Sequence, residues 1–254
     1  MSSLRQPFLF YGIEKIKKAW YRFYVTSRKD GNVMRIAVIH TTPATIASLG
    51  DLIRQEIPGT EVFNLLDDSI LTDMNQGHAV DKVRSRWLEY ARIAQDNGAQ
   101  AILSACSTVG EFAEEANQLL QVPVYRIDEA MAREAVRRGG NIYVFATLPS
   151  TLDPTTRLLQ RLSGEQANQC KIESVLVEGA YDALAAGNRA LHDEKIADAL
   201  EKHGIHADTI VLAQASMASA ADGLDPNLRR KVLTSPLLGI QKLRDDLSRL
   251  EAEK

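Results

Sequence analysis

The stretch RIAVIHTTPATI (residues 35–46) recurs as NIYVFATLPSTL (residues 141–152), and this repetition decides the fold that we expect. Each copy begins with an apolar run rich in β-branched or aromatic residues and continues into a short polar turn that contains proline. Such a run predicts a buried strand that ends at the turn. The copies align at a constant spacing of 106 residues, so that Thr41 matches Thr147.

A second pair of segments repeats at almost the same spacing. AQAILSACST (residues 99–108) aligns with ADTIVLAQAS (residues 207–216) at a spacing of 108 residues, which places Cys106 opposite Gln214. Two aligned blocks with nearly equal spacing make an accidental match the less favoured interpretation. They indicate that the chain consists of two halves with the same organisation.

Apolar strands alternate with amphipathic stretches throughout both halves, which predicts parallel sheets with helices on both faces. The expected fold class is α/β, with two similar domains related by a pseudo-twofold axis. Ligands of such sheets bind at the carboxyl ends of the strands, so we expect the active site in the cleft between the domains. The predicted strands are 35–40, 60–66, 99–105, 122–127, 141–147, 170–177, 207–213 and 230–235. The predicted domains are 34–138 and 139–225, with a strand and helix in 226–254 completing the fold.

Residues 1–33 differ from the remainder in charge and aromatic content. They carry a net charge of +5 within a chain of net charge -3, together with seven aromatic side chains. A basic, aromatic helix could lie on a membrane surface or bind a partner protein. We favour an extension outside the domains, because the first strand follows directly on Met34. We therefore expect a chain that begins at Met34 to fold.

The composition of the whole chain restricts its class. Of its 254 residues, 45% are hydrophobic and 25% are charged, which is typical of a soluble globular protein. The near-neutral charge argues against nucleic acid as the main partner, and the sequence contains no apolar run long enough for an integral membrane segment. Two cysteines are too few for a disulfide framework, so we expect a cytoplasmic protein, with a homo-oligomer left open.

Four loops follow strands that would end at the cleft: residues 40–45, 105–110, 146–151 and 213–218. They are rich in hydroxyl groups and nearly free of charge. Neutral donors near helix amino ends suit an anion such as a carboxylate, although helix capping explains the same residue types. Both interpretations stay open. The candidate substrate-binding residues are His40, Thr41, Thr42, Ser107, Thr108, Thr147 and Ser216.

Cys106 lies where a predicted strand gives way to a helix. A thiol near a helix amino end ionises more readily, and a thiolate can act as a nucleophile or transfer protons. The alternative is a small buried hydrophobic residue. Cys170 begins a strand at the end away from the cleft, and we interpret it as structural. We expect no cofactor and no metal, since neither metal-ligand spacing nor a nucleotide-binding glycine motif occurs.

The chain resembles the aspartate/glutamate/hydantoin racemase superfamily over roughly residues 34–240. The resemblance rests on four motifs: ACSTVG (105–110), VPVYRIDEAMAREAV (122–136), ATLPSTLDPTTRLL (146–159) and IVLAQASMA (210–218). It implies two α/β domains with an active site between them, without a cofactor. It also implies two cysteines, one removing a proton next to a carboxylate and the other returning one. Cys106 matches the first cysteine, and Gln214 occupies the place of the second.

Glutamine cannot serve as a general base, so a simple two-thiol racemase is in doubt. We expect a cofactor-independent racemase or isomerase-type enzyme, acting through the Cys106 thiolate on a small carboxylic or amino acid. The superfamily also includes isomerases of unsaturated diacids, and decarboxylases of substituted malonates that use a single cysteine. A decarboxylase or other lyase is therefore one alternative. A non-catalytic carboxylate-binding protein is another.

Overall fold

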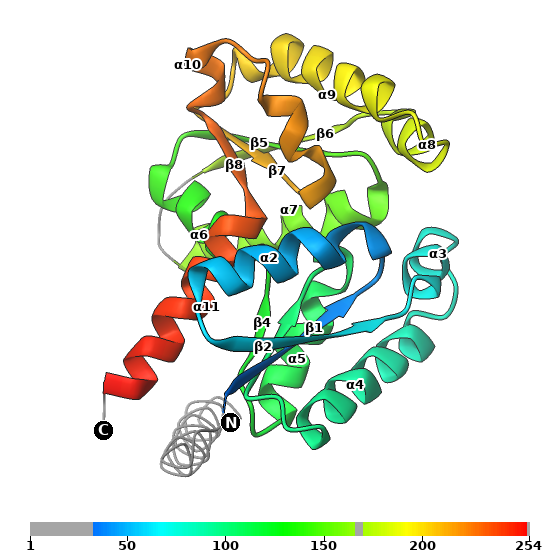
Figure 1. The fold of residues 1–254 in the computed structure, drawn as a ribbon. Helices are drawn as coiled ribbons and strands as arrows, with labels where there is room; N and C mark the ends of the chain where they lie inside the picture. The colour runs from blue at the N-terminus through cyan, green and yellow to red at the C-terminus, as the bar shows by residue number, and fades with distance from the viewer. Residues whose placement is uncertain (1–32, 166–169, 253–254) are drawn as a thin grey trace, which may run out of the picture.

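The computed structural model describes residues 33–165 and 170–252, and within them each half of the chain forms a parallel four-stranded sheet (Figure 1). The first sheet has the order β2-β1-β3-β4, and the second has the matching order β6-β5-β7-β8. The α/β fold with two similar halves is thereby confirmed. The strands are β1 (Met34–His40), β2 (Thr60–Leu66), β3 (Ala101–Ser104), β4 (Val124–Arg126), β5 (Asn141–Ala146), β6 (Lys171–Leu176), β7 (Thr209–Leu212) and β8 (Val232–Thr234).

The register of the strands reproduces the repeat in the sequence. In the first sheet Ile39 pairs with Ser104, and in the second Phe145 pairs with Leu212. Cys106 and Gln214 therefore follow matching ends of β3 and β7 by two residues each. Every predicted strand is present, most of them a residue or two shorter at the ends than the apolar runs suggested.

Helices cover both faces of each sheet, which is why the central strands read as continuous apolar runs. The first sheet lies between α4 (Val80–Asp96) with α5 (Gly110–Leu119) and α2 (Ile46–Glu56) with α11 (Ser235–Ala252). The second lies between α6 (Glu129–Arg138) with α7 (Pro149–Glu165) and α9 (Arg189–Gly204) with the 3₁₀ helix η4 (Ala215–Ala221). The remaining helices are short: η2 (Pro43–Thr45), α3 (Ser69–Asn75), η3 (Ser107–Val109), α8 (Ala180–Ala185) and α10 (Pro226–Arg229).

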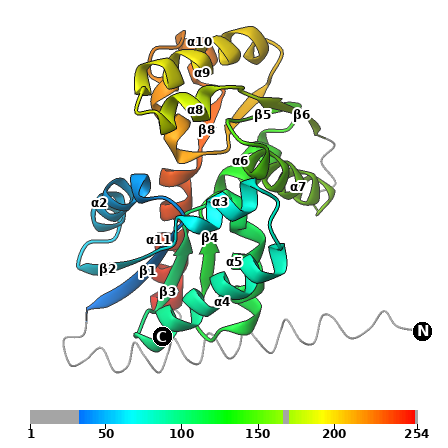
Figure 2. The same ribbon diagram turned by 90° about the vertical axis from the view of Figure 1, so that its right-hand side faces the viewer.

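The two halves exchange one helix each. Helix α6 follows β4 of the first sheet, yet its buried face, with Met131 and Ala135, packs on the second sheet. Helix α11 follows β8 of the second sheet, and its Ile240 and Leu243 pack on the first sheet beside Ile36. Figures 1 and 2 show α11, in red, running from the second half down along the first. Helix α6 thus lies before the expected domain boundary at residue 138 in the sequence, but it packs on the second half. The exact domain ranges stay a prediction.

None of the helices in the described part of the chain is both long and apolar enough to cross a membrane. The expectation that residues 1–33 form an extension falls almost entirely outside the described residues.

Candidate active site

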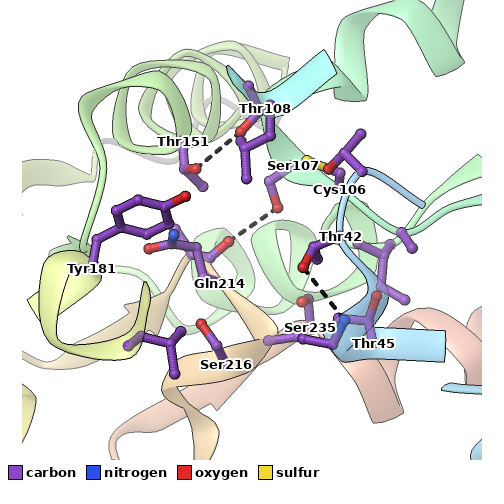
Figure 3. Close-up of a pocket in the computed structure, with 18 residues that line it drawn as sticks. Thr42, Thr45, Cys106, Ser107, Thr108, Thr151, Tyr181, Gln214, Ser216 and Ser235 are labelled. Carbon is purple, nitrogen blue, oxygen red and sulfur yellow. Dashed lines mark hydrogen bonds between the residues drawn. The ribbon is translucent and has the colours of Figure 1, made fainter. Parts of the chain in front are cut away.

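A pocket lies between the two halves at the carboxyl ends of their strands, and its cavity volume is about 130 Å³. Sites that hold drug-sized ligands usually measure about 300–1,000 Å³, so this pocket suits a small molecule. Most of its polar wall consists of aliphatic hydroxyl groups, and Figure 3 shows several of them facing a common space. These hydroxyls belong to Thr41, Thr42, Thr45, Ser107, Thr108, Thr151, Ser216 and Ser235.

Among the described residues that line the pocket there is no aspartate, glutamate, lysine, arginine or histidine. The side chains there that belong to the usual acid–base groups of enzymes are the Cys106 thiol and the Tyr181 phenol. Figure 3 places these two side chains on opposite sides of the pocket. An acid bound here would therefore meet neutral hydrogen-bond donors and two separate acid–base groups.

Cys106 directly precedes η3, and its backbone is extended, with φ -132° and ψ 121°. Its half-buried side chain lines the pocket and also contacts the apolar core of the first half. Cys170, in contrast, lies away from the pocket, with its Sγ 3.8 Å from the carbonyl oxygen of Val136. The structure thus separates the two cysteines in the way that the strand ends predict.

Gln214 directly precedes η4, and its backbone, with φ -126° and ψ 136°, is close to that of Cys106. Its side-chain oxygen Oε1 accepts two hydrogen bonds from Thr147, one from the backbone N–H at 2.6 Å and one from the hydroxyl at 2.9 Å. A backbone N–H can only donate, so these bonds fix which end of the amide is the oxygen. Thr147 consequently lies behind Gln214 rather than on the pocket wall.

Two buried hydrogen bonds connect the halves at the pocket. The Ser107 hydroxyl donates to the carbonyl oxygen of Ala213 at 3.1 Å, and the hydroxyls of Thr108 and Thr151 are 3.0 Å apart. The Ser107 proton is thus engaged within the protein. This residue contributes more to the junction of the halves than to donation toward a ligand.

His40 also lies behind the wall and is completely buried. Its Nε2 is 2.9 Å from Oδ1 of Asn64, and its Nδ1 is 2.8 Å from Oγ1 of Thr45. Burial lowers the pKa of His40, and the hydrogen bond with Asn64 opposes this only in part. A neutral ring with its proton on Nε2 can donate to Asn64 and accept from Thr45. His40 therefore positions Thr45, which lines the pocket.

Sequence reasoning missed four polar lining residues. Thr45 and Thr151 occupy matching positions of the first repeat block, so the repeat held a signal for both. Tyr181 lies in the first turn of α8 and Ser235 begins α11; neither belongs to a comparable motif, and only their packing brings them to the pocket. Asp67, which follows β2, is not among the lining residues; it accepts hydrogen bonds from the Ser69 N–H and the Tyr90 hydroxyl.

Among the residues that the structure describes, no group of three or more histidine, cysteine or carboxylate side chains could hold a metal ion. The polar groups of the pocket are hydroxyls, amides and one thiol. They suit a small organic acid more closely than a metal.

Comparison with known proteins relates this geometry to a family. Residues 36–243 match the model of the family described as Asp/Glu/hydantoin racemase. The structure resembles the allantoin racemase from Klebsiella pneumoniae, with 25% sequence identity, a TM-score of 0.59, and coverage of 86% of this chain and 89% of that one. No curated protein sequence matches the chain significantly.

Glutamate racemases share the fold at lower identity. Isoform RacE1 from Bacillus anthracis has a TM-score of 0.69 at 16% identity, with 85% of this chain and 82% of that chain covered. The enzyme from Francisella tularensis, solved with D-glutamate, has a TM-score of 0.70 at 14% identity, with 86% and 82% covered. At these identities the resemblance concerns the arrangement of the two halves.

Proposed function

The chain belongs to the Asp/Glu/hydantoin racemase family, and on this basis we propose that it moves a proton at the carbon next to the carboxylate of a small acid. The observation that carries the proposal is the position of Cys106 on the wall of a pocket whose described lining is rich in hydroxyl groups and includes no charged side chain. No cofactor takes part in this scheme.

In the proposed reaction the Cys106 thiolate removes the proton, and the electron pair of the broken C–H bond moves toward the carboxylate. Neutral donors on the pocket wall stabilise the charge that develops on the carboxylate oxygens. A proton then returns to the same carbon and restores the acid. The wall that holds the charge consists of fixed hydroxyls, which suits stabilisation of a transient anion.

A change of configuration requires that the second proton arrives on the opposite face of the carbon. Gln214 occupies the place of the second cysteine, and its amide cannot transfer protons. The Tyr181 phenol is the other acid–base group that lines the described pocket, and it lies across from Cys106 (Figure 3). We assign Tyr181 as the residue that exchanges a proton on this second face.

A lyase is the second candidate, and the replacement of the second thiol by Gln214 favours it. A decarboxylase needs only one proton donor, because loss of carbon dioxide creates the carbanion that the donor then protonates. Cys106 would serve as that donor. In this case the product would be formed with a proton delivered from one face only.

The test is solvent deuterium exchange, followed by NMR over a panel of small mono- and dicarboxylic acids. We expect wild-type protein to exchange the proton next to the carboxylate of at least one acid. Cys106→Ser should lower this rate about 100- to 10,000-fold, the usual contribution of general acid–base catalysis. Cys170→Ser, which removes the thiol outside the pocket, is the matched control and should retain activity.

Three results would contradict the racemase proposal. Full exchange by Cys106→Ser would exclude the thiol mechanism. Release of carbon dioxide from a diacid would identify the lyase. Binding of acids without any exchange would identify a carboxylate-binding protein.

A further inference from the structure

In the second half of the chain, the residue that follows β5 binds the side-chain oxygen of Gln214. The backbone N–H and the hydroxyl of Thr147 form a donor pair, and both donate to the side-chain oxygen of Gln214. Two donors that converge on one oxygen are the arrangement that also binds one oxygen of a carboxylate. In this protein the Thr147 donor pair binds an amide oxygen, which resembles a carboxylate oxygen as a hydrogen-bond acceptor.

By the repeat, the backbone N–H and the hydroxyl of Thr41 correspond to the donor pair of Thr147. Thr41 follows β1 as Thr147 follows β5, and Cys106 follows β3 as Gln214 follows β7. The backbone angles of Cys106 and Gln214 are also similar, so their side chains leave the matched strand ends in comparable directions. The glutamine oxygen lies three bonds beyond Cβ, whereas the cysteine sulfur lies one bond beyond it. The first half therefore lacks a side-chain oxygen at the place that Gln214 fills in the second.

The Thr41 hydroxyl is buried at the pocket and has no hydrogen-bond partner among the residues that the structure describes. The residue as a whole is only 2% exposed. Buried hydroxyls in folded proteins are normally satisfied, because leaving one unpaired is unfavourable. A ligand oxygen bound at Thr41 would supply the missing partner.

We propose that the N–H and hydroxyl of Thr41 bind the substrate carboxylate. In the second half, Gln214 occupies the equivalent donors of Thr147, so that no carboxylate binds there. The site then has one carboxylate position and selects acids with a single carboxylate. This inference rests on the proposed function, since it places the acid beside Cys106. It also weighs against decarboxylation of a malonate, which needs room for a second carboxylate.

The charge of the pocket supports selection against diacids. A second carboxylate would enter a pocket whose described lining contains no cationic side chain. Two carboxylates held close together in so small a pocket repel each other, and this neutral lining offers no positive charge to offset the repulsion. The Thr147 donor pair, the natural partner by symmetry, is already engaged with Gln214.

Binding of two matched acids to the full chain tests this inference. Isobutyrate and 2-methylmalonate differ by exchange of one methyl group for a carboxylate, and ligand-observed NMR titration gives both affinities. We expect wild-type protein to prefer isobutyrate roughly ten-fold or more, and Thr41→Val to lower isobutyrate affinity by a similar factor, as for one hydrogen bond to a charged group. Thr41→Ser keeps the hydroxyl and should retain binding, while Gln214→Ala should reduce the discrimination against 2-methylmalonate.

Each contrary result overturns a defined part of the inference. Absence of isobutyrate binding, or equal affinities for the two acids, would refute selection for a single carboxylate. If Thr41→Val and Thr41→Ser bind isobutyrate equally well, the carboxylate does not bind at the Thr41 hydroxyl. If Gln214→Ala discriminates against 2-methylmalonate as strongly as wild-type protein does, Gln214 does not block a second carboxylate position. Cys106→Ser separates the two proposals: if it retains exchange activity while the Thr41 results hold, the thiol mechanism fails and the carboxylate position stands.

Discussion

The hydroxyl oxygens of Thr108 and Thr151 lie 3.0 Å apart in a buried hydrogen bond that joins the two halves of the chain. Replacing either residue by valine keeps the shape of the side chain but leaves the other hydroxyl without its partner. Each single substitution should therefore lower the free energy of unfolding by about 1–3 kcal/mol.

The double variant Thr108→Val/Thr151→Val should lose less than the sum of the two single losses, since no unpaired hydroxyl remains. Chemical denaturation of the four proteins measures this coupling. Strictly additive losses would mean that the contact contributes nothing to the junction of the halves.

Tyr181→Phe removes the phenol proton and keeps the aromatic ring. If Tyr181 serves the face of the substrate opposite Cys106, the variant should lose interconversion of the two enantiomers about 100- to 10,000-fold. Exchange on the Cys106 face should persist. Following deuterium uptake by NMR and configuration by chiral chromatography on the same sample separates these outcomes; equal loss of both would assign Tyr181 to binding instead.

Gln214→Cys places a thiol at the position that matches Cys106 and releases the Thr147 donor pair. We expect faster interconversion of enantiomers than in wild-type protein, because a thiolate is a far better proton acceptor than an amide. Gln214→Ser is the control, as its side chain has a similar size and no useful acidity. Chiral chromatography of a racemising acid compares the variants, and identical rates for cysteine and serine would speak against a base at this position.

His40 should make stability depend on pH. Burial lowers its pKa in the folded state below the ordinary value of 6.5, so the unfolded chain binds a proton more readily. The stabilisation is complete above about pH 6.5 and is lost as the pH falls through the lowered folded-state pKa, by up to about 1.4 kcal/mol per pH unit. Urea denaturation between pH 5 and 8 should show a smaller loss for His40→Gln than for wild-type protein. Parallel profiles would contradict the assignment.

A chain that begins at Met34 should fold. Met34 starts β1, is buried, and packs in the core between the first sheet, α2 and α11, all of which this shorter chain retains. Thermal unfolding followed by circular dichroism should show a cooperative transition. Loss of that transition would make residues 1–33 a part of the fold.

The strands could be predicted because their signal is local. Ile36, Val38 and their neighbours form a continuous apolar run, and such a run between polar turns predicts a strand that is covered on both faces. The repeat then predicted that Cys106 and Gln214 follow equivalent strands. The ends of the strands were less accurate, because apolar residues also continue into the buried loops.

The site could be predicted only in part. Thr41, Cys106 and Ser216 follow strand ends, and the carboxyl ends of parallel strands meet at one edge, so their convergence followed from the sequence. The same reasoning placed His40 and Thr147 near the ligand, whereas both lie one layer behind the pocket wall. A residue's place along a strand predicts the edge that it reaches, but it does not show which side chain covers another.

By itself, the sequence determined the parallel α/β organisation, the internal repeat and the position of a thiol at a strand end, because periodicity and spacing encode which residues are buried and where strands stop. The tertiary structure alone decided that α6 and α11 change places between the halves, and that Tyr181 and Ser235 reach the pocket. It also decided that Thr147 holds the Gln214 oxygen while the Thr41 hydroxyl stays unpaired. These features depend on distances between segments far apart in the chain, which packing sets and no local pattern records.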